Sequence, residues 1–415
     1  MALVADLHLH SKFARGCSKD LDLEHLVLWG EKKGLNLIGT ADYTHPVWQA
    51  ELKAKLEDDG SGFQRLRGSD SSVRFVFSSE LSSIYSRGGR VRRMHYVILL
   101  PDLAAVERFT AMLAPRAKLA SDGRPILGLD AEIVARMALD ASERALIIPA
   151  HIWTPWFSLF GSMSGFDSVV EAFGEVAPLL AAVETGISSD PAMNWRLSQL
   201  DRYPIVSFSD AHSPQPHRIG REATIFELAE PTYEALWRAL RAPSEQNRIA
   251  STIEFYPEEG RYHYDGHRVC GIRFSPTETR AHNGRCPACG RPVTIGVLSR
   301  IEALADRAEG YVAPNRPPFR RLVPLTEVIA AALGVVQPTA KKVMAAYETL
   351  IHYAGNEFAI LHGGADVTGA AVPTAVLEAI EQVRRGELKI TPGYDGEYGR
   401  VELIAPTVAP AQALF

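Results

Sequence analysis

Histidine and carboxylate side chains recur where short apolar segments of the first 250 residues begin or end. His8 and His10 stand in DLHLH, where strand alternation would point both imidazoles to one face and Leu7 and Leu9 to the other. Further such residues at segment ends are Asp42, Glu80, His95, His151, Asp210 and His212. Imidazole and carboxylate ligands suit zinc, manganese or iron, with magnesium a further candidate. The pattern predicts two or three divalent cations and phosphoester hydrolysis, with His8, His10, Glu80, His151, Asp210 and His212 as its catalytic residues.

Glu184, in the segment AAVETG, follows the same pattern less clearly. Two interpretations stay open for it: a carboxylate that supports a metal ligand, or a locally structural group. For the whole set the alternative is a chance distribution of core and surface groups, which so many acids and imidazoles at segment ends make a poor explanation.

Three of the four cysteines lie between residues 270 and 289. The CxxC segment Cys286–Cys289 turns two thiolates toward one point, and His267 and Cys270 complete a Cys3His set. His263 is the alternative fourth ligand, and buried thiols without metal are the alternative interpretation. Four protein ligands leave no open coordination position, so we expect a structural zinc rather than a catalytic one.

Apolar and amphipathic segments alternate over residues 1–250 and would position these side chains. Strands are expected in LVADLHLH, LNLIGTAD, VRFVFSSE, MHYVILLP, ALIIPAH, LAAVETG, PIVSFSDAH and ATIFEL, with helices over 23–33 and 131–140 among the intervening segments. Repeated strand–helix units predict an α/β fold with a parallel sheet, and their number favours a closed barrel. In such folds the reactive groups lie at the carboxyl ends of the strands.

The composition and the pattern of apolar residues change near residue 250. We therefore expect three domains: a barrel over 1–250, a zinc module over 251–310 and a mainly helical domain over 311–415. Helices are predicted over 298–307, 325–334 and 339–354, and PGYDGEYG, up to Gly399, reads as a turn-rich loop. Residues 261–310 carry eight arginines and no lysine against five acids. Arginine forks bind phosphate, so a polyanion is the expected partner of this half, with Arg316 and Arg320 as candidate contacts.

The whole chain of 415 residues has a net charge of −5 and a pI near 6.2, which argues against coating nucleic acid by bulk attraction. No apolar stretch is long enough to cross a membrane and no secretory signal pattern opens the chain. A cytoplasmic protein without a membrane partner is expected.

The order His-x-His, Asp, Glu, His, His, Asp-x-His resembles the PHP superfamily of phosphoesterases. The resemblance implies a distorted (β/α)7 barrel with a trinuclear metal centre. By it, one ion would be held by His8, His10, Glu80 and Asp210, and a second by Glu80, His95 and His151. The third site departs from the usual pattern because Asp42 is followed by Tyr43; His212 and Asp42 are its expected ligands, with His45 and Cys17 as further candidates.

Nearly the whole chain also resembles the endonuclease Q family of DNA repair enzymes, through DLHLHSKFARGCSKDL, GTADYTHP, HIWTPWFSLFG, SDAHSP, RYHYDGHRVCGIRFSPTET, CPACG and TPGYDGEYG. This resemblance implies incision on the 5′ side of a deaminated base (uracil, hypoxanthine or xanthine) or an abasic site, leaving 3′-hydroxyl and 5′-phosphate ends. DNA carrying such lesions is then the expected partner, and a replication sliding clamp is a candidate recruiting partner.

A lesion that leaves the base stack needs a receiving pocket. Candidate linings are the loop after His151, with Trp153, Trp156 and Phe157, and the loop from Tyr394 to Tyr398, since aromatic faces can replace lost stacking. Simple packing is the alternative for each. Two other functions stay open: a PHP-family phosphatase or exonuclease acting on small phosphate esters or DNA ends, and a DNA-binding adaptor whose metal centre has decayed.

Overall fold

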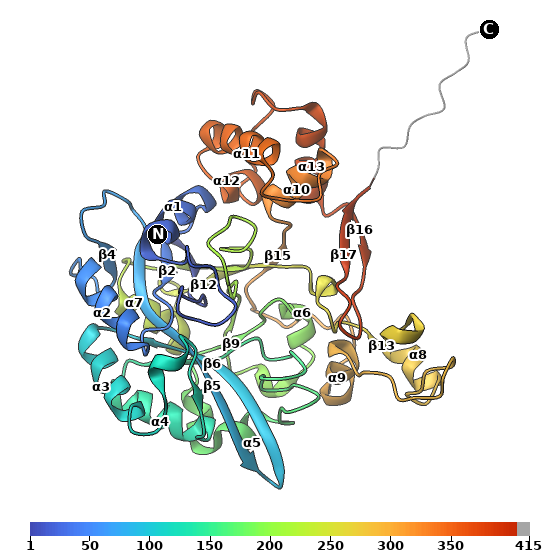
Figure 1. The fold of residues 1–415 in the computed structure, drawn as a ribbon, viewed down its shortest axis with the longest axis horizontal. Coiled ribbons are helices and arrows are strands. Elements are labelled where there is room, and N and C mark those ends of the chain that lie inside the picture. The colour runs from blue at the N-terminus through green and yellow to red at the C-terminus, as the bar shows by residue number, and fades with distance from the viewer. Residues whose placement is uncertain (405–415) are drawn as a thin grey trace.

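The computed structural model describes residues 1–404 and shows a mixed α/β fold (Figure 1). Each of the eight segments predicted as strands contains one. They are β1 (Ala2–Asp6), β2 (Leu37–Gly39), β5 (Arg74–Arg87), β6 (Arg90–Leu100), β8 (Leu146–Pro149), β9 (Val183–Glu184), β10 (Ile205–Val206) and β11 (Ala223–Glu227). The other elements of this part are β3 (Leu56–Asp58), β4 (Gln64–Leu66), β7 (Ile126–Leu127), β12 (Arg248–Glu254), α1 (Leu23–Lys33), α2 (Pro46–Lys55), α3 (Leu103–Leu113), α4 (Ala131–Ala141), α5 (Val169–Phe173), α6 (Pro191–Asn194) and α7 (Tyr233–Arg241).

The expectation of a parallel sheet is only partly correct. β1, β2 and β5 run parallel, as do β9 and β10, but β5 pairs antiparallel with β6, and β6 with β8. β11 is antiparallel to both β1 and β12. The connection between β5 and β6 consists of Gly88 and Gly89, both at positive φ, and so short a turn can join only antiparallel strands.

The strands close on themselves around a shared interior. Hydrogen-bonded pairs run from β12 through β11, β1, β2, β5 and β6 to β8. The Ala181 N–H donates to Ile147 on β8, and the Ser207 N–H donates to the Thr224 hydroxyl on β11, so the β9–β10 pair closes the ring between β8 and β11. One buried apolar cluster draws on β1, β2, β5, β6, β8, β10, β11 and α7. The ring of strands therefore surrounds a packed core that α7 covers.

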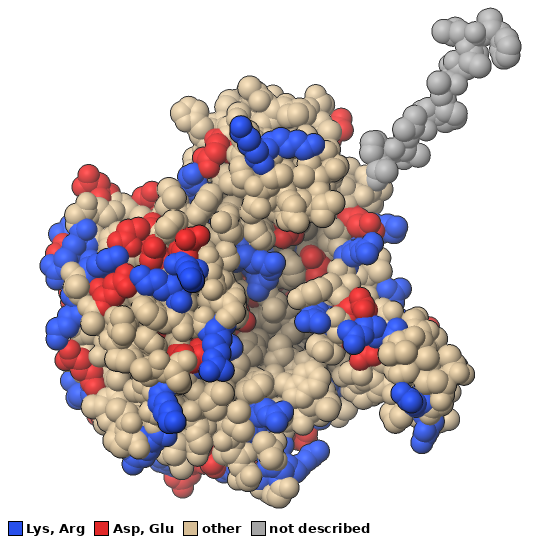
Figure 2. All heavy atoms as spheres, viewed as in Figure 1, with Lys and Arg blue, Asp and Glu red and all other residues tan. Residues whose placement is uncertain are grey.

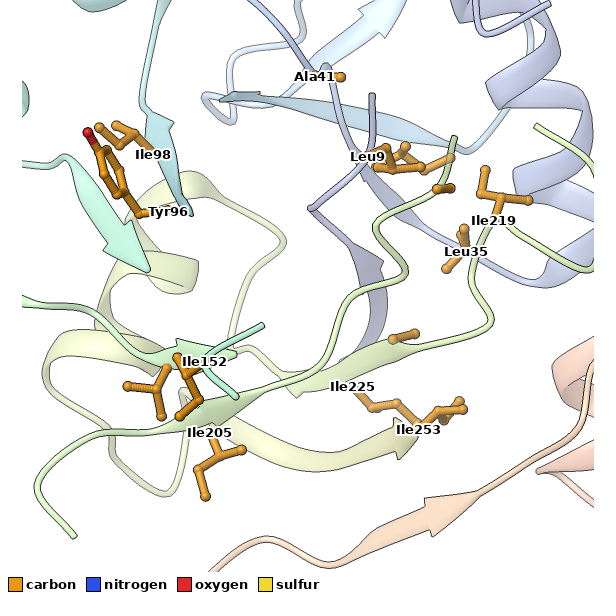
Figure 3. Packing of buried hydrophobic residues seen from close by; sticks show 14 of the residues in the cluster. Leu9, Leu35, Ala41, Tyr96, Ile98, Ile152, Ile205, Ile219, Ile225 and Ile253 are labelled. Carbon is orange, nitrogen blue, oxygen red and sulfur yellow. The ribbon is translucent and has the colours of Figure 1, made fainter. Parts of the chain in front are cut away.

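A second apolar cluster lies between the strands and the outer helices α2, α3 and α4. Figure 3 shows members of it, among them Tyr96 and Ile98 on β6, Ile225 on β11 and Ile253 on β12. Along β6 the alternate residues Val97 and Leu99 belong to the inner cluster instead, so both faces of this strand are buried. That burial explains why the strands read as nearly continuous apolar segments.

The second half of the chain forms two smaller parts. The cysteine-rich part contains β13 (Asp265–His267), β14 (Ile272–Phe274), α8 (Pro276–Ala281) and α9 (Val297–Leu304). Then follow β15 (Phe319–Arg321), α10 (Leu325–Ala332), α11 (Lys341–Ala354), α12 (Glu357–Leu361), α13 (Thr374–Arg385), β16 (Leu388–Thr391) and β17 (Arg400–Leu403). β15 pairs with β12, so residues beyond position 311 extend the main sheet.

The predicted helices are present with shifted ends. The helix predicted over 298–307 is α9, which ends at Leu304. It ends there because the N–H groups of Asp306 and Arg307 donate to the Arg196 carbonyl rather than continuing the helix. The segment PGYDGEYG is a loop as predicted, but it joins β16 and β17 in a hairpin that the sequence did not indicate. In Figure 1 the helices α10–α13 lie beside α1, and the hairpin lies between them and β13. In the described residues no helix is long and apolar enough to cross a membrane.

A buried ion pair joins the C-terminal helices to the ring. Lys33 Nζ, at the end of α1, lies 2.7 Å from Glu357 Oε1 on α12, and both side chains are 1% exposed. The same ammonium group donates to the Pro216 carbonyl, and the same carboxylate oxygen accepts from the Leu325 N–H. Three segments distant in sequence thus meet at one pair of charges.

Replacing Lys33 by Met is expected to lower the free energy of unfolding by about 3–5 kcal/mol, because Glu357 would remain buried without a counter-charge. The matched control is Lys32→Met, since Lys32 pairs at 2.6 Å with Glu348 on the surface, where such a pair contributes about 0–1 kcal/mol. Urea titrations of the two variants make the comparison. Equal losses in both would contradict a special role for the buried pair.

Candidate metal centre

The side chains predicted as ligands converge at one end of the ring. β1 ends at Asp6, and the following residues continue as an extended segment in which Leu9 pairs with Ala211 and the His10 N–H donates to Ala211. His8 and His10 offer ligand atoms to one group, as the alternation predicted. Leu7 shares the inner apolar cluster with Leu3 and Ala5, whereas Leu9 belongs to the outer cluster. Pairing with Ala211, next to Asp210, holds the segment at Leu9 and His10.

The first group comprises His8, His10, Glu80 and Asp210, each offering a ligand atom within 4.8 Å of the others. His10 Nε2 lies 3.0 Å from Asp210 Oδ1 and 3.3 Å from Glu80 Oε2. His8 Nε2 lies 3.6 Å from Glu80 Oε1 and is buried with no hydrogen-bond partner. A buried ring nitrogen without a partner is costly unless a ligand takes it, and a cation meets that need.

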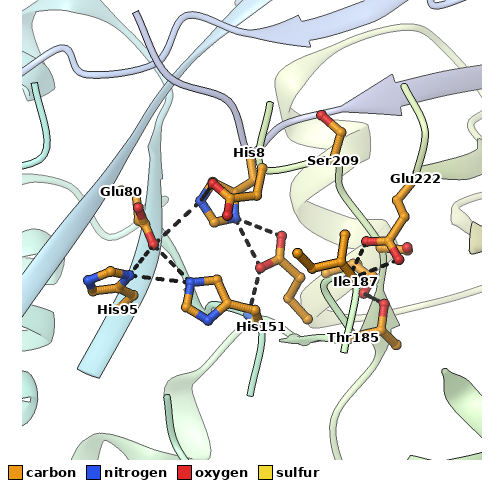
Figure 4. A network of polar contacts seen from close by, with 12 residues as sticks. His8, Glu80, His95, His151, Thr185, Ile187, Ser209 and Glu222 are labelled. Carbon is orange, nitrogen blue, oxygen red and sulfur yellow. Dashed lines mark hydrogen bonds and ion pairs between the residues drawn. The ribbon is translucent and has the colours of Figure 1, made fainter. Parts of the chain in front are cut away.

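The second group comprises Glu80, His95 and His151. Glu80 Oε1 lies 2.7 Å from His95 Nδ1 and 3.2 Å from His151 Nε2 (Figure 4). Glu80 belongs to both groups, so one carboxylate can bridge two cations. Two metals that share a carboxylate are the arrangement that clamps a phosphoryl group between them.

The electrostatics of the centre favour added positive charge. Burial opposes a charge on His8, yet the carboxylates of Glu184, Glu80 and Asp210 raise its pKa well above the usual value. Burial would raise the pKa of Glu80, but His95, Arg124 and His8 hold it well below its usual range. For His95 burial dominates and lowers the pKa to about 4, which keeps the imidazole neutral and able to bind a metal.

Glu184 supports a ligand. Its Oε1 lies 2.9 Å from His8 Nδ1, and its Oε2 accepts the His151 N–H at 2.7 Å. A hydrogen bond from Nδ1–H to this carboxylate leaves His8 Nε2 as the free lone pair that points into the first group. Of the two interpretations that the sequence left open, these contacts favour the supporting role.

Replacing Glu184 by Gln is expected to weaken metal binding by about 10–100-fold, since an amide orients the imidazole less strongly and adds no basicity. Competition with a chelator on the metal-free protein measures this affinity. Glu222→Gln is the matched control, because burial and the nearby Glu254 raise the pKa of Glu222 well above its usual value and its oxygens accept backbone N–H groups outside both ligand groups. Equal affinity in both variants would rule out the role of Glu184.

Three of the predicted ligands have an unusual backbone. Asp42, His151 and Asp210 have φ values of 41°, 29° and 48°, in the left-handed region that residues with a side chain rarely adopt. Each follows a strand of the ring directly or within a few residues. Such backbone strain persists where the surrounding structure enforces it, commonly at functional sites.

The residues expected at a third metal site are close by but differently engaged. Asp42 Oδ2 accepts both the N–H and the hydroxyl of Ser11, each at 2.7 Å. His212 Nδ1 lies 2.8 Å from the Asp210 carbonyl, and the ring of His45 accepts the Trp48 N–H at the start of α2. Burial raises the pKa of Cys17 to about 12, so its thiol stays protonated. Within residues 1–404 none of these joins a ligand group, and a third metal site stays a prediction.

One residue that the sequence did not indicate contacts the centre. Arg124 Nη1 donates to Glu80 Oε2 at 2.8 Å. It lies in the irregular segment between η1 (Leu119–Ser121) and β7, where no periodic pattern marks a functional residue.

The four predicted zinc ligands form the third group of metal-ligating atoms: His267, Cys270, Cys286 and Cys289. His267 Nδ1 lies 3.5 Å from Cys289 Sγ. Burial opposes ionisation of Cys286, but the backbone N–H groups of Cys289 and Ala288 lower its pKa to about 7, which favours the thiolate that zinc binds. His263 stacks on Tyr264 instead and is not in the group.

The predicted substrate-binding aromatics differ in exposure. Trp153 is 1% exposed and donates its indole N–H to Asn194, so in this conformation its ring offers no face to a ligand. Trp156 is half-buried against Tyr262 of the cysteine-rich part, with ring centroids 5.5 Å apart. Tyr394 pairs with Tyr264 by a backbone bridge. Tyr398 is 72% exposed, with the Arg261 guanidinium 5.0 Å from its ring centroid.

The two arginines predicted to bind a polyanion contact the backbone. Arg316 donates to the Tyr203 carbonyl at 2.8 Å, and Arg320 donates to the carbonyls of His362 and Arg384 at 3.1 and 2.6 Å. The hydrogen bond of Arg316 joins the second half of the chain to the ring, and those of Arg320 join segments within the second half. Figure 2 shows a hollow between the ring and the cysteine-rich part, with side chains of both signs along its rim.

The chain is similar to known proteins both along nearly its whole length and in its C-terminal part. Residues 324–387 match the family model of the MJ0043 C-terminal domain. The uncharacterised protein MJ0043 of Methanocaldococcus jannaschii is 34% identical over 60% of this chain and 31% of its own length. The uncharacterised protein YqxK of Bacillus subtilis is 30% identical over 96% of this chain and 99% of its own. The chain thus spans about a third of MJ0043 and nearly all of YqxK.

Two solved structures match at full length. The crystal structure of the lesion-specific endonuclease PfuEndoQ from Pyrococcus furiosus has a TM-score of 0.85 and 31% identity, covering 97% of this chain and 96% of that one. A structure of endonuclease Q in complex with a 27-mer duplex that carries an abasic lesion at the active site has a TM-score of 0.84 and 31% identity, covering 97% of each chain.

Proposed function

The chain belongs to the endonuclease Q family, and from that premise we propose that it is a DNA repair endonuclease that cuts on the 5′ side of deaminated bases and abasic sites. The observation that carries the proposal is Glu80, which joins two buried ligand groups. One group alone would suit many metal sites. Two groups sharing a carboxylate suit phosphodiester hydrolysis.

The proposed architecture is a PHP-type distorted barrel over residues 1–250, a zinc module over 251–310 and a helical domain over 311–415. The closed ring of strands with its ligands at one end supports the first assignment. The Cys3His group supports the second. The helices α10–α13 support the third, although β15 pairs with β12 and so joins this part to the main sheet.

In the proposed centre His8, His10, Glu80 and Asp210 hold one divalent cation, and Glu80, His95 and His151 hold another. The residues fit this role because His8 Nε2 is a buried nitrogen without a partner and the donors are imidazole and carboxylate only. Divalent cations bound to such a set supply a nucleophile from water at neutral pH and neutralise charge on phosphate oxygens. Glu184 keeps His8 in the tautomer that presents Nε2.

The proposed reaction is hydrolysis of one phosphodiester. The oxygen of a water molecule bonds to phosphorus, the bond between phosphorus and the 3′ oxygen breaks, and the 3′ oxygen leaves as a hydroxyl after taking up a proton. The products are a 3′-hydroxyl end and a 5′-phosphate end. Burial of Glu80 and His8 excludes bulk water from the ligands and strengthens each charge interaction in the centre.

Recognition of the lesion is assigned to aromatic groups of the loop after His151 and of the cysteine-rich and C-terminal parts. A base that pairs badly leaves the stack at lower cost, and exposed aromatic faces replace its lost contacts. Trp156 against Tyr262, and Tyr398 beneath Arg261, offer such faces next to positive charge. We assign lesion contacts to these residues rather than to the buried Trp153.

A labelled duplex with one internal abasic site, deoxyinosine or deoxyuridine tests the proposal. A single nick 5′ to the lesion, with a 3′ end that a polymerase can extend, is the expected result. A ladder of products would indicate an exonuclease, and hydrolysis of p-nitrophenyl phosphate with intact DNA would indicate a phosphatase. Binding without cutting in the presence of manganese, zinc or magnesium would indicate an adaptor.

A further inference from the structure

Arg124 is held at the metal centre by the segment that carries it. Asp122 Oδ1 accepts the N–H groups of Arg15 and Arg124 at 3.1 and 3.2 Å, and the Gly123 N–H donates to the Phe13 carbonyl. A Cβ at Gly123 would lie 2.3 Å from Asp42 Oδ2. The backbone therefore presses against Asp42 as closely as only glycine permits, and this contact fixes the next residue beside Glu80.

The guanidinium group of Arg124 is only partly used. A guanidinium carries five N–H donors, and in the described part of the chain its one hydrogen bond goes to Glu80 Oε2. By contrast, Arg300 makes three hydrogen bonds, to Phe160, Phe166 and Asp167. The Arg124 side chain is 26% exposed, whereas the Glu80 side chain that it contacts is fully buried, so Arg124 reaches from the centre to solvent.

Further positive charge lies near this segment. A neighbouring cavity of 560 Å³, which Arg124 does not line, is lined by Arg15, Arg116, Lys118 and Asp122, among others, and Asp122 stands two residues before Arg124. An arginine side chain is not deprotonated in proteins, so Arg124 is a permanent cation beside Glu80.

We propose that Arg124 is a catalytic residue that donates hydrogen bonds to a non-bridging oxygen of the scissile phosphate while it stays bound to Glu80. Negative charge on those oxygens must be neutralised as the phosphoryl group is transferred, and a planar guanidinium with free donors does this without moving. The inference rests on the proposed function, because it names a contact to the substrate of that reaction.

The alternative is that Arg124 only positions Glu80, and the two roles predict different measurements. A group that only positions the bridging carboxylate controls how tightly metals bind. A group that contacts phosphate controls the reaction and the binding of phosphate, with metal content unchanged.

The test compares Arg124→Ala and Arg124→Lys with Arg116→Ala. The last variant removes an exposed cation from the neighbouring cavity that Arg15 and Lys118 also line. Arg124→Ala is expected to cut an abasic duplex about 10²–10³-fold more slowly in single turnover, as loss of one oxyanion donor typically does. Arg124→Lys should fall between it and the unaltered protein. Arg116→Ala should keep the single-turnover rate at saturating enzyme and lose only affinity.

Two readouts do not depend on cutting. Metal content of Arg124→Ala should equal that of the unaltered protein by elemental analysis, and its affinity for inorganic phosphate by calorimetry should fall at least about tenfold, the effect of a lost charge-assisted contact. Added guanidinium chloride should restore part of the cutting by Arg124→Ala and leave the single-turnover rate of Arg116→Ala unchanged.

Loss of metal in proportion to loss of rate, or unchanged phosphate affinity, would overturn the inference in favour of the positioning role. A rate within about threefold of the unaltered protein would overturn it outright. If the unaltered protein cuts no lesion duplex at all, the proposed function fails as well, and that outcome is recognised before any variant is made.

Discussion

An Asp210→Asn variant is expected to cut lesion-containing DNA at least about 10³-fold more slowly than the unaltered protein, beyond the 10–100-fold typical of residues that only support a ligand. Asp210 Oδ1 lies 3.0 Å from His10 Nε2 and 3.6 Å from His8 Nε2, at the centre of the first ligand group. An amide keeps the shape of this side chain but removes its negative charge. His8→Ala should have a similar effect, because it removes the nitrogen that has no other partner.

Metal content and DNA binding distinguish a damaged centre from a damaged fold. Elemental analysis should find at least one metal ion fewer per molecule in either variant, while affinity for an abasic duplex changes little because His8 is buried and the Asp210 side chain is only 15% exposed. His25→Ala, a partly exposed histidine on α1, serves as the control and should cut normally. Normal cutting by Asp210→Asn and His8→Ala would refute the assigned centre. So would active protein that contains a single zinc ion per molecule.

The positions of the ligands were predictable because each interrupts or closely follows an apolar segment. Burial on two sides makes strands continuous apolar segments in the sequence, so a charged residue or histidine within or just after one stands out. The predicted strand ends were correct near His151, two residues beyond β8, but wrong at Glu80 and His95, which lie inside β5 and β6 because these strands extend further toward their shared turn. The convergence of these ends in space follows from a ring of strands, which the alternation of elements also predicted.

Strand direction and pairing were less predictable. Gly88 and Gly89 indicate a tight turn, and a tight turn joins antiparallel strands. The apolar segments on either side are also typical of parallel strands, and the prediction followed these segments rather than the turn. β12 was missed because exposed and half-buried residues interrupt its first half and one of its two partners, β15, lies some seventy residues away. Local patterns carry no information about a partner at that distance.

For the residues that contact the metal ligands, residue type alone did not reveal the role. Glu184 could not be separated from a structural carboxylate until its contact with His8 was seen, and nothing in the sequence around Arg124 marks it. Arg316 and Arg320 present the opposite case. Their charge suggests a polyanion, yet their guanidinium groups bind backbone carbonyls, a use of arginine that no composition reveals.

The cysteine-rich part should lose its structure when its zinc site is removed. Its own apolar cluster consists of Phe274, Cys286 and Val293, with Cys270 and Ile272 at the edge, so two of the zinc ligands are also part of its core. Binding of a structural zinc contributes on the order of 10–16 kcal/mol in small zinc modules. No comparable stabilisation is available from so few apolar side chains.

Cys286→Ser is therefore expected to release one zinc per molecule and to unfold this part, while the ring of strands stays intact. Trypsin should then cleave faster at the exposed Arg273, Arg285 or Arg291, because a locally unfolded backbone is a better protease substrate, and affinity for DNA should fall because Arg261 and Tyr262 lose their support. Hydrolysis of bis(p-nitrophenyl) phosphate, which needs only the metal centre, should persist. Cys17→Ser is the matched control, since Cys17 is the one cysteine outside the group of ligands. Unchanged zinc content in Cys286→Ser would show that these side chains hold no metal, because a hydroxyl at that position cannot replace the thiolate.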